Sequence, residues 1–125
     1  MNRVLRAIVA LSGALFVVIG LRWVTDPAAA AEALGMPLLS GVGRSTQIGD
    51  MAAFFLTLGI TILMGAITGQ RAWFHAPILL LGLAAGFRIV AWLVHDAALA
   101  MHLIAPEVIV AAVLALAAIR LGEGR

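Results

Sequence analysis

Four long apolar segments account for most of this chain of 125 residues. A helix needs about 20 predominantly apolar residues to cross the hydrocarbon core of a bilayer. We expect four such helices, over about 4–24, 46–68, 74–95 and 104–121. Only 11% of the residues are charged, against about a quarter in a soluble domain. The sequence therefore predicts one all-α domain, an integral membrane four-helix bundle.

The rest of the composition narrows the classes of function. There is no cysteine, which excludes disulfides, iron–sulfur clusters and zinc–thiolate sites. The eight basic residues are all arginines, they are scattered singly, and the net charge is only +2. This pattern suits membrane topology better than a basic patch for nucleic acid. We expect the lipid bilayer as a partner, no nucleic acid, and no cofactor or metal.

The placement of arginines predicts an orientation. Arg3 and Arg6 precede the first span, Arg71 lies between the second and third spans, and Arg120 ends the fourth. With four spans these all fall on one side, and positive residues favour the cytoplasm. We expect an N-in/C-in protein of a bacterial inner membrane. A competing interpretation takes the first span as a signal peptide cleaved near the alanines at 28–30.

A short helix is expected in the one long loop. Asp26 suits a helix N-cap, Pro27 suits the first helical position, and Gly35 suits the end of a helix. The residues between them are mostly alanine, which favours helix. We therefore predict a helix between spans 1 and 2, lying at the membrane interface.

Charged residues inside the apolar segments are the strongest functional signal, because such groups usually face the protein interior or a cavity. At 100° per residue, most polar residues of the second span share one stripe with Asp50. Arg88 shares a face of the third span with Trp92 and His95. We expect Asp50 and Arg88 to form an intramembrane ion pair or a water-bridged contact.

Titratable groups collect in the half of the bundle predicted to be outermost. We expect a cavity there that opens outward and is walled by Phe54, Phe87 and Trp92. Asp50 and Glu107 are the candidate acid/base residues, since paired carboxylates serve that chemistry. The candidate ligand-binding residues are Arg88, Gln47, Trp92, His95, Arg44 and Phe54.

Each of these residues also has a structural interpretation. Asp50 and Arg88 can simply lock two helices together, and Glu107 follows Pro106 as an acid in a first helical turn. A His/Asp/His cluster at 95, 96 and 102 is a weak metal candidate. Trp23, Trp73 and Trp92 are expected interface anchors.

Three strings, at 20–28, 34–37 and 43–50, resemble a family of small uncharacterised bacterial four-helix membrane proteins that is similar in layout to the DoxX-like group. In that family a loop with proline and alanine precedes the second helix, whose entry has an arginine–serine pair, three further residues and then a glycine–aspartate pair. An arginine lies in the third helix. Arg44, Gly49, Asp50 and Arg88 occupy those places here. The resemblance implies the fold and favours Asp50 and Arg88. It implies no substrate.

Three functions remain open at this point. The first is a polar pocket, facing the outer leaflet, that binds or also transforms a small lipophilic molecule. The second is a structural or accessory membrane subunit in which the Asp50–Arg88 pair only fixes helix packing. The third is a small proton-coupled transporter, which would need a homo-oligomer because one chain is small for alternating access.

Overall fold

The computed structural model describes residues 1–123, and this part of the chain is almost entirely helical. Its elements are α1 (Arg3–Thr25), α2 (Pro27–Ala33), α3 (Gly41–Thr68), the 3₁₀-helix η1 (Arg71–Phe74), α4 (His75–Val94) and α5 (Met101–Glu123). Four of them, counting η1 with α4, are long and apolar enough to cross a membrane. The all-α class and the four long segments are thus confirmed.

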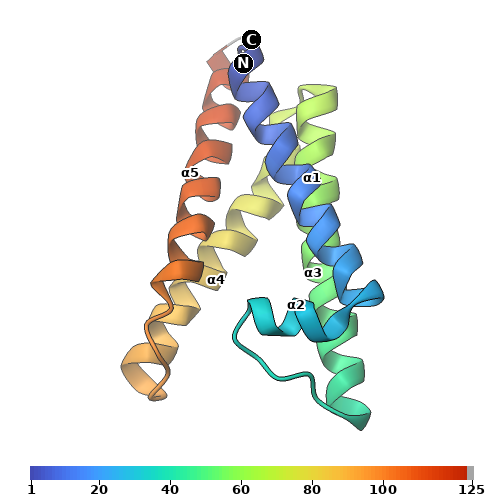
Figure 1. Cartoon of the computed structure of the whole chain (residues 1–125). Coiled ribbons are helices and arrows are strands. Elements are labelled where there is room, and N and C mark those ends of the chain that lie inside the picture. The colour runs from blue at the N-terminus through green and yellow to red at the C-terminus, as the bar shows by residue number, and fades with distance from the viewer. Residues whose placement is uncertain (124–125) are drawn as a thin grey trace.

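The long helices are arranged as two pairs (Figure 1). α1 packs along α3, and α4 packs along α5. The pairs meet where the chain begins, where α5 ends and where α3 connects to α4, which we call the closed end (Figure 1). They diverge toward the connections 26–40 and 95–100, which we call the open end. The expected bundle is therefore splayed: the helices do not pack together along their whole length.

Glycines explain the tight pairing of α1 with α3. A Cβ atom added at Gly59 would lie 2.6 Å from the carbonyl oxygen of Gly13 and 2.7 Å from the backbone nitrogen of Val17. A Cβ at Gly20 would likewise lie 3.0 Å from the backbone nitrogen of Leu56. Small residues let helix backbones approach this closely, as is common between apolar helices.

Phe74 joins the two pairs at the closed end. Its ring is fully buried and lies against Gly65, where any side chain would displace it. It belongs to a core cluster that also contains Val9 of α1, Leu81 of α4 and Leu114 of α5. All four long helices therefore contribute to one packed core at this end.

α2 forms as the sequence predicts. Asp26 caps it, with Oδ1 accepting a hydrogen bond from the backbone N–H of Ala29 at 3.4 Å, Pro27 is its first residue, and Gly35 adopts φ 77° just beyond its end. A second core cluster joins α2 to α1 and α3, and Trp23 is fully buried within it. The expectation of Trp23 as an interface anchor is therefore wrong, because its indole lies under α2.

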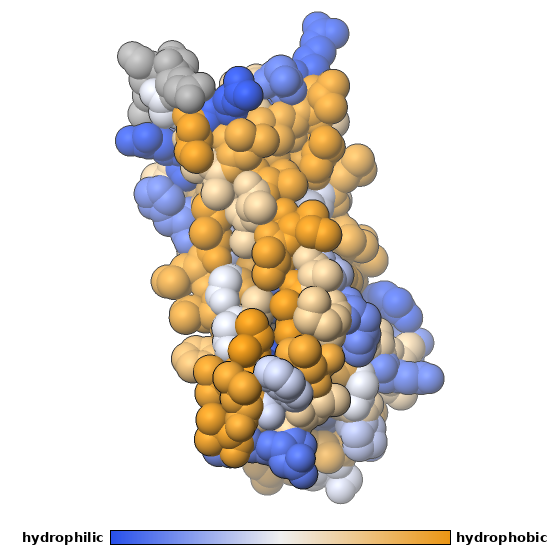
Figure 2. All heavy atoms as spheres, turned by 90° about the vertical axis from the view of Figure 1, so that its left-hand side faces the viewer, coloured by the Kyte–Doolittle hydropathy of each residue, from blue (hydrophilic) through white to orange (hydrophobic). Residues whose placement is uncertain are grey.

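The outside of the helices is rich in exposed apolar side chains. On α4 and α5 these include Leu79, Phe87, Leu93, Val108 and Ile119, each more than half exposed. Figure 2 shows this side of the molecule: apolar atoms cover its middle, and hydrophilic residues gather toward the two ends. Such an extended apolar surface is far larger than a water-soluble monomer carries.

Two expectations about local packing are wrong. Pro106 lies inside α5 and not at its first turn, because the helix already begins at Met101. The polar stripe of α3 does not face inward: Asp50 and Thr57 are exposed.

Candidate functional site

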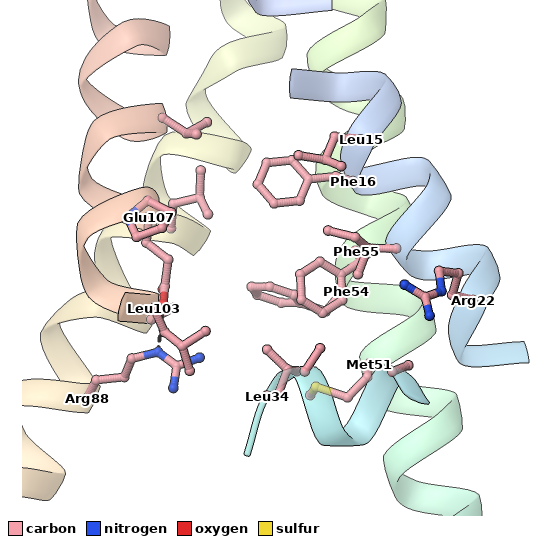
Figure 3. A pocket seen from close by; sticks show the side chains of 17 residues that line it. Leu15, Phe16, Arg22, Leu34, Met51, Phe54, Phe55, Arg88, Leu103 and Glu107 are labelled. Carbon is pink, nitrogen blue, oxygen red and sulfur yellow. Dashed lines mark hydrogen bonds and ion pairs between the residues drawn. The ribbon is translucent and has the colours of Figure 1, made fainter. Parts of the chain in front are cut away.

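A cavity of about 470 Å³ lies between the two helix pairs, toward the open end. One wall comes from α1, α2 and α3, with Phe16, Phe54 and Phe55 as its largest side chains. The other wall comes from α4 and α5 and includes Leu81, Ala84, Leu103 and Val110. Figure 3 shows the phenylalanines facing Arg88 and Glu107 across this space. The volume is in the range of about 300–1,000 Å³ typical of small-molecule sites.

The aromatic wall is itself well packed. The rings of Phe16 and Phe55 stack with centroids 6.1 Å apart. The ring of Phe54 meets that of Phe55 edge to face at 5.1 Å. These are favoured aromatic geometries, so the rings form a fixed apolar surface. Of the predicted walls, Phe54 lines the cavity, whereas Phe87 and Trp92 are outward-facing and do not.

Arg88 and Glu107 form the polar part of the cavity wall made by α4 and α5. Nε of Arg88 donates to Oε1 of Glu107 at 2.6 Å, joining α4 to α5. The side chain of Arg88 is 33% exposed and that of Glu107 only 14%. Oε2 of Glu107 is buried and has no hydrogen-bond partner among residues 1–123. The pair is therefore a single-point contact.

The expected pairing of Asp50 with Arg88 is wrong. Within the described residues, the salt bridge between Arg88 and Glu107 is the only one. Asp50 is exposed and lines a separate groove beside the loop, with Met36, Thr46 and Gln47. α4 packs mainly against α5 and much less against α3, so Arg88 meets the carboxylate of α5.

Gln47 and Arg44 hold the loop before α3. Gln47 is buried, and its side chain accepts from the backbone N–H of Leu39 at 2.7 Å and donates to the carbonyl of Pro37 at 3.1 Å. Nε of Arg44 donates to the carbonyl of Leu39 at 2.8 Å. Neither residue lines the large cavity. Both residues were predicted to bind a ligand, but their side chains instead hold the loop in place.

The remaining predicted site residues lie apart from the cavity. Trp92 is 46% exposed, and His95 caps the end of α4 through its backbone. No set of three histidine, aspartate or glutamate side chains in residues 1–123 is close enough to hold a metal ion. Of the eight predicted residues, the structure thus brings together Arg88, Glu107 and Phe54.

Arg22 is a cavity residue that the sequence reasoning did not select. It lies near the end of α1 and lines the cavity on the wall opposite Arg88 (Figure 3). In the sequence Arg22 lies beside Trp23 and near Asp26, a pattern typical of the end of a membrane helix. Only the packing of α1 against α3 and α2 shows that its side chain borders this space.

Comparisons with protein-family models, with curated proteins and with solved structures find no match to this chain.

Proposed function

We propose that the chain is an integral membrane protein that binds a small lipophilic molecule in the cavity between its helix pairs. The observation that carries this proposal is the cavity itself: about 470 Å³ of space, apolar on nearly every side, with Arg88 and Glu107 at one wall. An apolar pocket with a few convergent polar groups is the usual form of a ligand site.

The exposed apolar surface supports insertion into a bilayer. Each of the four long apolar segments has 22 to 28 residues, which corresponds to at least about 33 Å at 1.5 Å per residue. That length suffices for a hydrocarbon core of about 30 Å. Arg3, Arg6 and Arg71 lie at the closed end, so the positive-inside rule assigns this end to the cytoplasm. The host membrane we propose is a bacterial inner membrane, with the cavity entered from the outer leaflet.

Binding is better supported than acid/base catalysis or a purely structural role. Asp50 and Glu107 line different spaces, so the two carboxylates do not form the acid/base pair expected from the sequence. A structural subunit would need only a filled interior. Here the Arg88–Glu107 contact joins α4 to α5, but open space remains beside it.

A cavity-filling substitution tests the proposal. Ala84 lines the cavity, so Ala84→Trp should occupy it; Ala112 is exposed on α5 outside the cavity, so Ala112→Trp is the matched control. The probe is hexadecanol, added to protein in phosphatidylcholine nanodiscs and read by native mass spectrometry. We expect wild type and Ala112→Trp to retain one hexadecanol and Ala84→Trp to lose it by about tenfold or more, because the apolar contact area is taken.

Equal retention by all three proteins would contradict the proposal, since hexadecanol would then be held by the outer surface. Absence of retention by wild type would contradict it as well. Thermal unfolding of both variants checks that Ala84→Trp remains folded.

A further inference from the structure

We propose that the cavity selects lipophilic molecules with an oxyanion head, which is a carboxylate or a phosphate. Arg88 binds this head through hydrogen bonds donated by Nη1 and Nη2. In this arrangement Glu107 is a positioning residue that fixes the guanidinium of Arg88. The inference rests on the proposed function, because it concerns the head of a ligand whose apolar part fills the same cavity.

The contact between Arg88 and Glu107 leaves most of the guanidinium free. A guanidinium carries five N–H donors, and only the one on Nε is engaged, at 2.6 Å from Oε1 of Glu107. In the part of the chain that the structure describes, Nη1 and Nη2 form no hydrogen bond. Figure 3 shows the guanidinium beside the cavity, with Glu107 meeting it on the Nε side. A guanidinium binds carboxylate or phosphate in two parallel hydrogen bonds, and here the edge with Nη1 and Nη2 is free to do so.

Burial explains why Glu107 suits a positioning role. Its Oε2 atom is buried and has no hydrogen-bond partner in residues 1–123. Glu107 therefore contacts Arg88 through Oε1 alone and leaves both Nη groups of Arg88 free. Its side chain is more buried than that of Arg88. Glu107 therefore holds Nε from within the wall, while Arg88 remains accessible to a ligand.

The charge of the cavity favours an anion. Its charged lining residues are Arg22, Arg88 and Glu107, which leaves one positive charge uncompensated. Arg22 lies on the wall across from Arg88 and forms no ion pair within the described chain. Arg22 is exposed, so this charge carries no burial cost, but the excess positive charge still attracts an anionic head more strongly than a neutral one. The phenylalanines of the opposite wall leave the rest of the space to a hydrocarbon chain.

The first test compares two probes that differ only in the head. Wild type in phosphatidylcholine nanodiscs is titrated with hexadecanoic acid and with hexadecanol, at a pH where the acid is ionised, and bound ligand is read by native mass spectrometry. We expect the acid to bind about tenfold more tightly than the alcohol, because it gains two charge-assisted hydrogen bonds. In Arg88→Lys, which keeps the charge but loses the two-point geometry, this preference should fall about fivefold.

The second test isolates the positioning role at constant charge. Glu107→Gln and Glu107→Leu both remove the negative charge, but only glutamine keeps an oxygen that accepts from Nε of Arg88. We expect the preference for acid over alcohol to rise in Glu107→Gln and to be about fivefold lower in Glu107→Leu than in Glu107→Gln, the effect of one hydrogen bond. The preference is the ratio of the two affinities measured on the same variant, and thermal unfolding checks that each variant remains folded.

The possible outcomes separate this inference from the proposed function. If wild type binds acid and alcohol equally, and Ala84→Trp blocks both, the oxyanion preference is overturned and the cavity remains a lipophile site. If neither probe binds, both are overturned. Equal preferences in Glu107→Gln and Glu107→Leu overturn the positioning role of Glu107.

The source of the oxyanion is distinguished in the same assay. Hexadecyl phosphate should bind like the acid, because both heads suit the same edge of Arg88. Phosphatidate placed in the nanodisc then competes with hexadecanoic acid if the occupant is a membrane phospholipid, and leaves it bound if the occupant is a single-chain acid. Either result supports an oxyanion head; failure of hexadecyl phosphate and hexadecanoic acid alike overturns it.

Discussion

The two ends of this molecule are packed by different means. At the closed end all four long helices contribute to one core around Phe74. At the open end the two helix pairs separate. There α1, α2 and α3 share a second core around Trp23, the Arg88–Glu107 pair joins α4 to α5, and Gln47 holds the loop before α3. This difference indicates that the core joining the two helix pairs and the proposed binding cavity lie in separate regions. Substitutions at the two ends should therefore have separable effects.

Phe74→Ala should break the closed end and have the largest effect. The fully buried ring fills the space between the helix pairs, and loss of a buried phenylalanine costs about 3–5 kcal/mol in unfolding free energy. Phe87→Ala is the matched control, because its ring is 64% exposed, and should cost about 0.5 kcal/mol or less. The unfolding free energies of both variants are measured in mixed micelles, with tryptophan fluorescence as the signal. Similar losses in the two variants would contradict the assignment of the core.

Gly59→Ala tests the pairing of α1 with α3 that extends from the closed end toward the open one. The new methyl group would lie 2.6 Å from the Gly13 carbonyl oxygen, which is backbone and cannot turn aside. We expect a loss of about 3 kcal/mol, the upper part of the range for overpacking. Gly82→Ala places the same methyl group in open space and should gain up to about 1 kcal/mol from helix propensity. A gain in both variants, by the same unfolding measurement, would show that α1 and α3 do not touch at Gly59.

Gln47→Leu should give the smallest effect, confined to the open end. It leaves the N–H of Leu39 and the carbonyl of Pro37 without their side-chain partner, which costs about 1–2 kcal/mol. Hydrogen exchange of the Leu39 amide should accelerate by about tenfold, while Phe74 and its neighbours keep their protection. Gln70→Leu, at an exposed residue, is the control. Unchanged exchange at Leu39 would contradict the role given to Gln47.

The sequence predicts the helices well and their partners poorly. The length of each apolar segment predicts the positions of α1, α3, α4 and α5, and the Asp26–Pro27 cap predicts α2. Both signals are local, so they can be recognised in the sequence. Which helix faces which is a property of packing. The phase of Asp50 and the phase of Arg88 were each read from one helix, and neither carries the information that α4 packs against α5.

The cavity shows the same limit. Glu107 could be selected as a charged residue in an apolar segment, but not as the partner of Arg88. Arg22 resembled an ordinary end of a helix, and Trp23 resembled an interface anchor until α2 was seen to cover it. The close approach of α1 to α3 also escapes a motif search. It depends on Gly13 and Gly20 of α1 and on Gly59 of α3, which come together only when the two helices pack.

Photolabelling tests the central claim most directly, namely that a lipophilic molecule occupies the cavity between the helix pairs. A hexadecanol carrying a diazirine in its chain is irradiated with the protein in phosphatidylcholine nanodiscs, and the labelled residues are mapped by mass spectrometry. We expect saturable labelling of cavity residues on both walls, such as Phe54 and Leu103, that excess hexadecanol prevents. Labelling that does not saturate and is spread over outward-facing residues such as Leu79 and Val108 would contradict it.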